Sequence, residues 1–116
     1  MSILANVLVA FVALLHLLFL VLEMFLWSKP FGRKTFGLTK ELAEGSAKLA
    51  ANQGLYNGFL AAGLIWGIAS NLFEVKVFFL VCVIVAGVFG AFTAKRSILF
   101  VQAVPGALAL IVLTLS

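Results

Sequence analysis

Glu23 and His16 carry the chemistry that this sequence makes possible. They lie seven residues apart in an otherwise almost wholly apolar run over residues 3–27. Ionisable groups in such a run are rare and costly to bury, so each is a candidate functional residue. Seven residues make nearly two helical turns, which places both side chains almost on one face. The carboxyl group could act as a proton-linked switch, as a counter-ion for a cation, or as an acid or base beside the imidazole.

A second polar cluster interrupts the apolar run over residues 49–69. Its members occupy one arc of about 140° on a helix, and they are Asn52, Gln53, Tyr56 and Asn57. Gly54 and Gly58 are expected on the opposite side, as a small-residue strip where another helix approaches. Two interpretations of the cluster stay open. The amides either join helices and hold Glu23 for packing alone, or they line a binding site with it.

Neither a metal site nor a known catalytic motif is indicated. Two helical turns separate His16 from Glu23, whereas the ligands of one ion must lie within about 2 Å of it. The sequence contains no His-Glu-x-x-His, no Gly-x-Ser-x-Gly and no phosphate loop. The single Cys82 excludes an internal disulfide. We therefore expect no metal and no cofactor, and whether the protein is an enzyme stays open.

The composition indicates a lipid environment for these residues. Of 116 residues, 65% are hydrophobic and 10% are charged, and the mean hydropathy is +1.25. Soluble domains are closer to half apolar. We predict an all-α integral membrane protein, one antiparallel bundle of transmembrane helices that forms a single domain over residues 1–116. The predicted spans are residues 3–27, 49–69, 77–94 and 98–115, with the first one retained as a helix rather than cleaved as a signal peptide.

The basic residues predict the orientation of these spans, because Lys and Arg in short loops are retained in the cytoplasm. Only Lys76 lies between the second and third spans, whereas the other two loops contain Lys29, Arg33, Lys34, Lys40, Lys48, Lys95 and Arg96. We expect a bacterial inner (plasma) membrane protein with both termini on the non-cytoplasmic side. The net charge of +4 then reflects topology and attraction to anionic lipid, and nucleic acid is not an expected partner.

The cytoplasmic loop over residues 28–48 is predicted to have two parts. Pro30, Gly32 and Gly37 favour an irregular first part. Thr39 is a candidate N-cap for a helix that begins at Lys40 and runs into the second span. The weak apolar face of this helix suggests a segment along the inner membrane surface that then turns into the bilayer, and a solvated connector is the alternative.

The polar residues of all four predicted spans gather in the cytoplasmic half of the membrane, with Asn6 as the main exception. Gln102 and Pro105 lie near the start of the last span, where the proline is expected to kink the helix and free a carbonyl group. The outer half is nearly pure aliphatic and aromatic. This one-sided distribution predicts a polar pocket that opens to the cytoplasm, lined by His16, Glu23, Asn52, Gln53, Tyr56, Asn57 and Gln102.

Several stretches resemble a known family. They are residues 22–27 (LEMFLW), 34–39 (KTFGLT), 49–64 (LAANQGLYNGFLAAGL) and 99–102 (LFVQ). They are similar to small bacterial integral membrane proteins catalogued as domain of unknown function thirteen hundred and four. The resemblance implies a four-span membrane protein and supplies no activity. Small multidrug exporters share the length, the spans and a first-span Glu, but the strong charge bias of these loops counts against a dual-topology dimer.

Three functional hypotheses follow. The first, which the one-sided polarity favours, is a pocket that binds a small amphiphile or lipid-like molecule, either as a binding protein or as an enzyme with Glu23 and His16 as acid and base. The second is a proton-linked carrier or exporter in which Glu23 binds a small cation. The third is an accessory subunit that docks a partner through Gly54 and Gly58. Membrane lipid is the expected partner in each case, and a homo-oligomer is compatible with all three.

Overall fold

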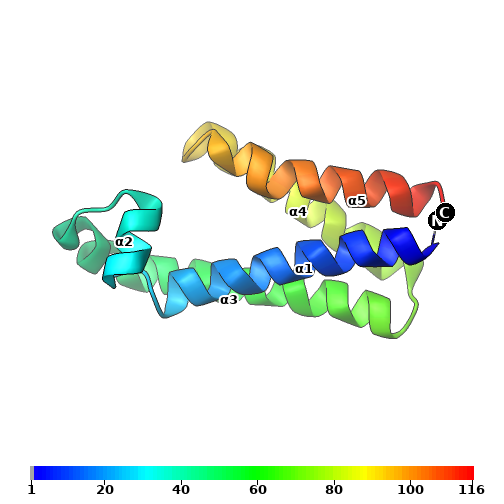
Figure 1. Cartoon of the computed structure of the whole chain (residues 1–116), viewed down its shortest axis with the longest axis horizontal. Helices are drawn as coiled ribbons and strands as arrows, with labels where there is room; N and C mark the ends of the chain where they lie inside the picture. The colour runs from blue at the N-terminus through cyan, green and yellow to red at the C-terminus, as the bar shows by residue number, and fades with distance from the viewer. Residues whose placement is uncertain (1) are drawn as a thin grey trace. The chain divides into compact units, whose positions relative to one another are not determined.

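Every regular element of the protein is a helix over residues 2–116, the part that this computed structural model describes. The helices are α1 (Ser2–Met24), α2 (Pro30–Phe36), α3 (Lys40–Ala69), α4 (Phe73–Thr93), the π-helical turn η1 (Leu99–Ala103) and α5 (Val104–Thr114) (Figure 1). The prediction of an all-α protein is therefore confirmed for these residues.

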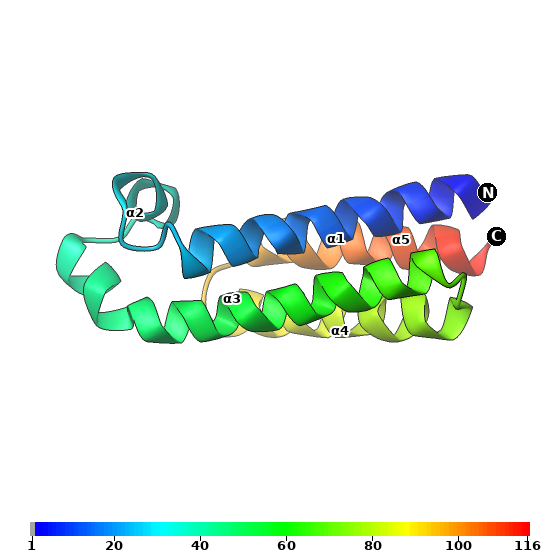
Figure 2. The same cartoon turned by 90° about the horizontal axis from the view of Figure 1, so that it is seen from below.

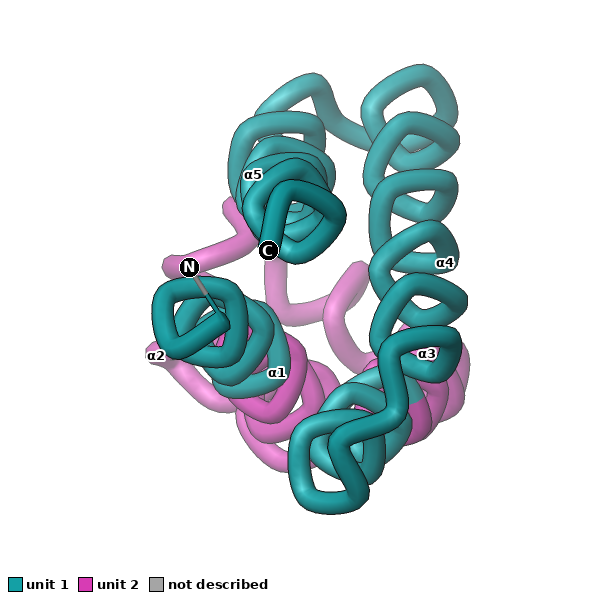
Figure 3. Tube along the Cα trace, turned by 90° about the vertical axis from the view of Figure 1, so that its right-hand side faces the viewer, with its two compact units in different colours: residues 1–14, 60–116 teal, residues 15–59 magenta. Residues whose placement is uncertain are grey.

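The chain forms two compact units, which we describe separately. Unit 1 contains residues 1–14 and 60–116, and unit 2 contains residues 15–59 (Figure 3). Two long helices, α1 and α3, contribute residues to both units. Most of the polar residues singled out in the sequence belong to unit 2.

Unit 1 has an aliphatic core with small residues at the helix contacts. Its buried side chains come from the first part of α1, the last part of α3, α4 and α5, and include Val9, Leu64, Leu80, Val83 and Ala109. α4 and α5 pack against each other and run in opposite directions (Figures 1 and 2). Gly87 of α4 allows a close approach to Ala103 of η1. A Cβ atom there would lie 2.7 Å from the backbone nitrogen of Ala103 and 2.8 Å from its Cβ.

In unit 2, an aromatic contact holds α2 against the segment that precedes it. The rings of Trp27 and Phe36 are 4.8 Å apart. The indole Nε1 of Trp27 donates a hydrogen bond of 3.0 Å to Ser46 Oγ in the first part of α3. Gly32 faces the backbone of Leu26, which leaves no room for a side chain at that position. These contacts tie the segment after α1 to α3.

The sequence reading of residues 28–37 as irregular was wrong. Pro30 lies in the first turn of α2, where a missing N–H costs nothing, and Gly37 caps its end in the left-handed conformation (φ 66°, ψ 40°). The Gly37 amide donates to the carbonyl of Arg33. Pro30 and Gly37, two of the three residues that suggested an irregular segment, therefore mark the start and the end of a short helix.

The predicted N-cap at Thr39 and the helix that begins at Lys40 were confirmed. The amide of Leu42 donates to Thr39 Oγ1 at 3.1 Å, so Thr39 is an N-cap. The helix then runs unbroken from Lys40 to Ala69. A separate segment that turns into the bilayer is therefore absent from residues 40–69.

The four-span bundle is supported only in part. By length and composition, α1 and α4 could each cross a membrane, and the apolar segment Leu99–Thr114 is shorter. The predicted second span lies within α3, where Asn52, Gln53 and Asn57 make the helix less apolar. The ends of two helices also differ from the ends of the predicted spans. The first helix ends at Met24 rather than residue 27, and α4 begins at Phe73 rather than residue 77, after a turn with Asn71 at φ 52°.

The start of the last helix contains a π-helical turn directly before Pro105. A proline has no N–H, so the carbonyl four residues before it loses its helical partner. Here η1 directly precedes Pro105, and the Val104 amide donates to the carbonyl of Leu99, five residues back. A local π-helical turn therefore shifts the hydrogen bonding before the proline.

The approach of α4 to η1 gives a stability prediction. Gly87→Ala adds a Cβ against the Ala103 backbone, and we expect it to lower the free energy of unfolding by about 1 to 3 kcal/mol. Gly45→Ala is the matched control, because a Cβ at Gly45 meets nothing within 4 Å. Alanine there is expected to raise helix stability by about 0.5 to 1 kcal/mol. Thermal unfolding in detergent, followed by circular dichroism, measures both, and equal shifts would contradict the close approach.

Candidate functional site

A buried carboxyl–amide pair is the centre of the polar region in unit 2. Glu23 lies in the last turn of α1 and Asn57 lies midway along α3. Asn57 Nδ2 donates a hydrogen bond of 2.5 Å to Glu23 Oε1. Each side chain is only 8% exposed. A carboxyl group with so little contact with water depends on its partner, because burying an unpaired polar group costs several times what a hydrogen bond gains.

Two glycines of α3 bring the helices close enough for this pair to form. A Cβ atom at Gly54 would lie 2.6 Å from Met24 Cγ and 3.1 Å from Glu23 Cβ. A Cβ atom at Gly58 would lie 2.7 Å from Leu20 Cδ1. A larger residue at Gly54 would push the last turns of α1 away from α3 and lengthen the Glu23–Asn57 hydrogen bond, whereas one at Gly58 would displace the end of the Leu20 side chain.

This contact face differs from the one expected from the sequence. The glycine strip was placed opposite the polar cluster, but Asn57 packs on the same side as Gly54 and Gly58. The reason is the angular position of Asn57 around the α3 axis. Asn57 is at the edge of the polar arc, only about 60° around the helix from Gly54. The face towards α1 is therefore made of two glycines and one amide.

The other polar residues of α3 are not part of the pair. Asn52, Gln53 and Tyr56 are exposed, and the Tyr56 ring lies 6.1 Å from that of Phe59. Within residues 2–116, none of the three is hydrogen-bonded to Glu23. Their predicted role as lining residues of a binding pocket stays a prediction.

His16 and Gln102, the remaining predicted site residues, lie in different units. His16 is fully buried in unit 2, on the same face of α1 as Glu23, and its ring meets Phe19 edge-on at 5.2 Å. Gln102 is half-buried in η1 of unit 1. Within residues 2–116, no three His, Cys, Asp or Glu side chains are grouped as metal ligands.

The sequence analysis missed a second buried ionisable group. Lys76 was assigned to a loop, yet it lies in the first turn of α4 and is 4% exposed. Its Nζ donates to Asn6 Oδ1 of α1 at 3.0 Å, within unit 1. Gly67 makes room for the lysine stem, since a Cβ there would lie 2.6 Å from Lys76 Cγ. The helical spacing of the buried residues Lys76, Leu80, Val83 and Gly87 is the signal that could have revealed it.

Comparison with known proteins places the chain in a family. The model of the family described as "Protein of unknown function (DUF1304)" matches residues 10–114, and the chain belongs to this family. The chain is 34% identical over 115 residues to the uncharacterized protein YpaA of Lactococcus lactis subsp. lactis (strain IL1403), covering 96% of this chain and 97% of the relative. No solved structure matches.

The family assignment rests on the match over residues 10–114 and not on the short stretches of resemblance. The family description states no membrane location and no number of spans, so the four-span architecture implied by the resemblance has no support in it. Neither this description nor the name of the relative states an activity.

The Glu23–Asn57 pair gives a prediction about folding. Asn57→Leu removes the donor and leaves the carboxyl group buried, so we expect the free energy of unfolding to fall by about 1 to 3 kcal/mol. Asn52→Leu makes the same change at an exposed position of α3 and should stay within about 0.5 kcal/mol of the wild type. Thermal unfolding in detergent compares the two variants. Equal stability of both variants would show that the pair is energetically unimportant.

Proposed function

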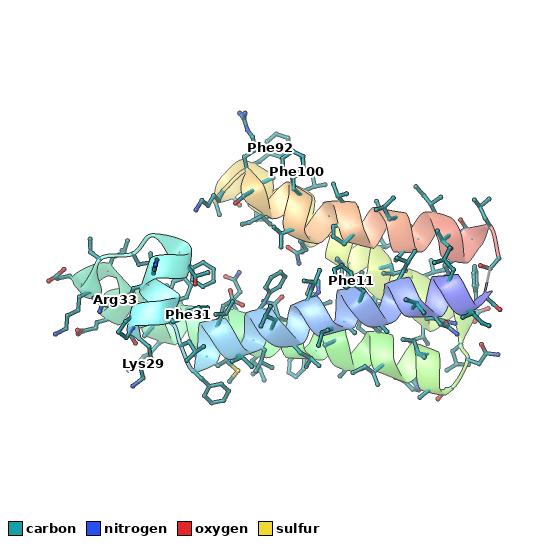
Figure 4. The ribbon with its side chains drawn as sticks, in the orientation of Figure 1. Phe11, Lys29, Phe31, Arg33, Phe92 and Phe100 are labelled. Atoms are coloured by element: carbon teal, nitrogen blue, oxygen red, sulfur yellow. The ribbon has the colours of Figure 1, made fainter. Side chains whose placement is uncertain are left out.

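We propose that this protein resides in the bacterial plasma membrane and binds a small cationic amphiphile at Glu23. Support for the location comes from α1 and α4, which are long and apolar enough to cross a bilayer. Large apolar side chains on both helices are also exposed, including Phe11 (Figure 4), Leu14, Phe78, Val85 and Phe89. Exposed apolar faces of this extent are costly in water and stable in lipid.

The chemistry of the Glu23–Asn57 pair supports a cationic amphiphile as the ligand. A carboxyl group has two oxygens, and the hydrogen bond from Asn57 uses one of them. The side chains beside Glu23 at the helix contact, Leu20 and Met24, are aliphatic or thioether. An ammonium or hydroxyl headgroup would donate to the carboxyl group while its alkyl chain lies against this apolar surface. The observation that carries the proposal is a carboxyl group in an apolar setting, with one of its two oxygens hydrogen-bonded to Asn57.

A binding experiment tests the role of Glu23. Purified protein in detergent is titrated with dodecylamine, and bound amine is counted by native mass spectrometry. Glu23→Gln keeps an acceptor for Asn57 but removes the charge, so we expect affinity to fall about tenfold or more, as for a lost charge-assisted hydrogen bond. Glu44→Gln removes the same charge at an exposed position of unit 2 and should bind as the wild type does.

The outcomes of this titration are distinct. Loss of affinity in Glu23→Gln alone supports the site. An equal loss in both Glu variants indicates general electrostatic attraction of the amine, and unchanged binding in Glu23→Gln places the amine elsewhere. Either of the last two results overturns the proposal for Glu23. Circular dichroism of each variant establishes that the fold is retained.

The proposed orientation, with both termini outside the cytoplasm, is tested by labelling. Single cysteines are introduced in a Cys82→Ala background, and intact cells are treated with a membrane-impermeant maleimide. We expect Asn71→Cys to react in intact cells, and Lys34→Cys and Lys95→Cys to react only after permeabilisation, because basic loops are retained inside. Reaction of all three from the same side would rule out the proposed crossings.

A further inference from the structure

The turn between α4 and η1 (residues 94–98) contains two basic residues and no acidic one. Lys95 and Arg96 are both exposed in this turn. Glu74 is the only acidic residue of unit 1. It lies in the first turn of α4, about 30 Å along the helix from the turn at 1.5 Å per residue. No carboxylate of unit 1 is therefore close enough to pair with Arg96.

A cavity of about 340 Å³ opens beside this arginine. Its lining residues, Ala91, Phe92, Arg96 and Leu99, all belong to unit 1. The volume falls within the range of small-molecule sites, roughly 300 to 1,000 Å³. One guanidinium group is the only charged group of this lining, and the other side chains are apolar. Such a lining suits a ligand with one anionic group and an adjoining apolar part.

Local hydrogen bonds hold the backbone of the turn, and they therefore fix the position of the Arg96 backbone. The Lys95 amide donates to the Gly90 carbonyl at 3.0 Å, and the Leu99 amide donates to the Arg96 carbonyl at 3.1 Å. Ile98 packs against the backbone of Gly90, because a Cβ atom at Gly90 would lie 3.1 Å from Ile98 Cγ2. The entry and the exit of the turn are therefore fixed next to the cavity.

Two phenylalanines extend from the same end of unit 1. Phe92 is 87% exposed and Phe100 is 64% exposed, and Figure 4 labels both at the end of unit 1 that contains the turn. Exposed aromatic residues next to basic ones are typical of segments at a lipid interface, where the rings enter the acyl region and the cations meet phosphate. An inorganic anion would leave both rings without a role.

We propose that this cavity binds the headgroup of an anionic phospholipid. The Arg96 guanidinium binds the phosphate through paired N–H donors, a geometry that suits arginine better than lysine. Leu99 and Ala91 contact the adjoining glycerol and the start of the acyl chains, and Phe92 and Phe100 insert beside them. The proposal rests on the membrane location proposed above but not on the Glu23 site.

The test measures lipid binding to the purified full chain in detergent. Native mass spectrometry follows titration with dioleoyl phosphatidylglycerol, with dioleoyl phosphatidylcholine, and with inorganic phosphate. We expect the anionic lipid to bind most tightly, and Arg96→Gln to weaken it about tenfold, as expected for a lost charge-assisted contact. Lys95→Gln removes the same charge from the neighbouring position outside the cavity lining and should change the affinity less than about threefold.

Several results would overturn the proposal. Equal weakening by Arg96→Gln and Lys95→Gln would indicate diffuse attraction to the basic turn. Equal affinity for the zwitterionic lipid would remove the requirement for negative charge. Competition by inorganic phosphate at equal concentration would identify a free-anion site instead. The titration uses an anionic lipid and the Glu23 experiment uses a cationic amphiphile, so the two proposals fail separately.

Discussion

The close approach of α1 to α3 at Gly54 and Gly58 is the constraint on which the polar region of unit 2 depends. Without side chains at these two positions, the last turns of α1 lie against α3, and Glu23 meets the amide of Asn57 while both stay nearly inaccessible to water. Glycine is costly inside a helix. Its presence at both contact positions is explained by the hydrogen bond that the short distance allows, since a longer one would leave a buried carboxyl group without a partner.

The same arrangement recurs in unit 1 with the opposite charge. Lys76 is buried and donates to the Asn6 side chain, and Gly67 provides the space for its stem. In each unit, an asparagine satisfies one buried ionisable group and a glycine makes room for the contact. Asparagine suits both cases because its side chain has a donor and an acceptor. Each of these two polar contacts, Glu23–Asn57 and Lys76–Asn6, is therefore made within its own unit.

The description of the family and the name of the relative state no activity, and function is inferred from the chemistry of individual sites rather than from the fold. Two of them have complementary character. Glu23 is a hydrogen-bond acceptor in an apolar setting, which is the basis for proposing a cationic amphiphile as its ligand. Arg96 is a donor beside an apolar cavity and favours an anionic headgroup. An interface with lipid would supply both kinds of ligand, which is consistent with the exposed apolar faces of α1 and α4.

The sequence by itself determined the helical class and the N-cap at Thr39, and it singled out Glu23 as a rare ionisable group in an apolar run. These depend on composition, local spacing and short-range hydrogen bonds, all readable along the chain. Only the tertiary structure decided that Asn57, and not Gln53 or Tyr56, meets Glu23, and that Lys76 is buried rather than in a loop. Partner choice depends on which face of each helix packs inward, and a rotation of about 60° is enough to exchange one neighbour for another. Residues on one polar arc are equivalent in the sequence until a neighbouring helix selects among them.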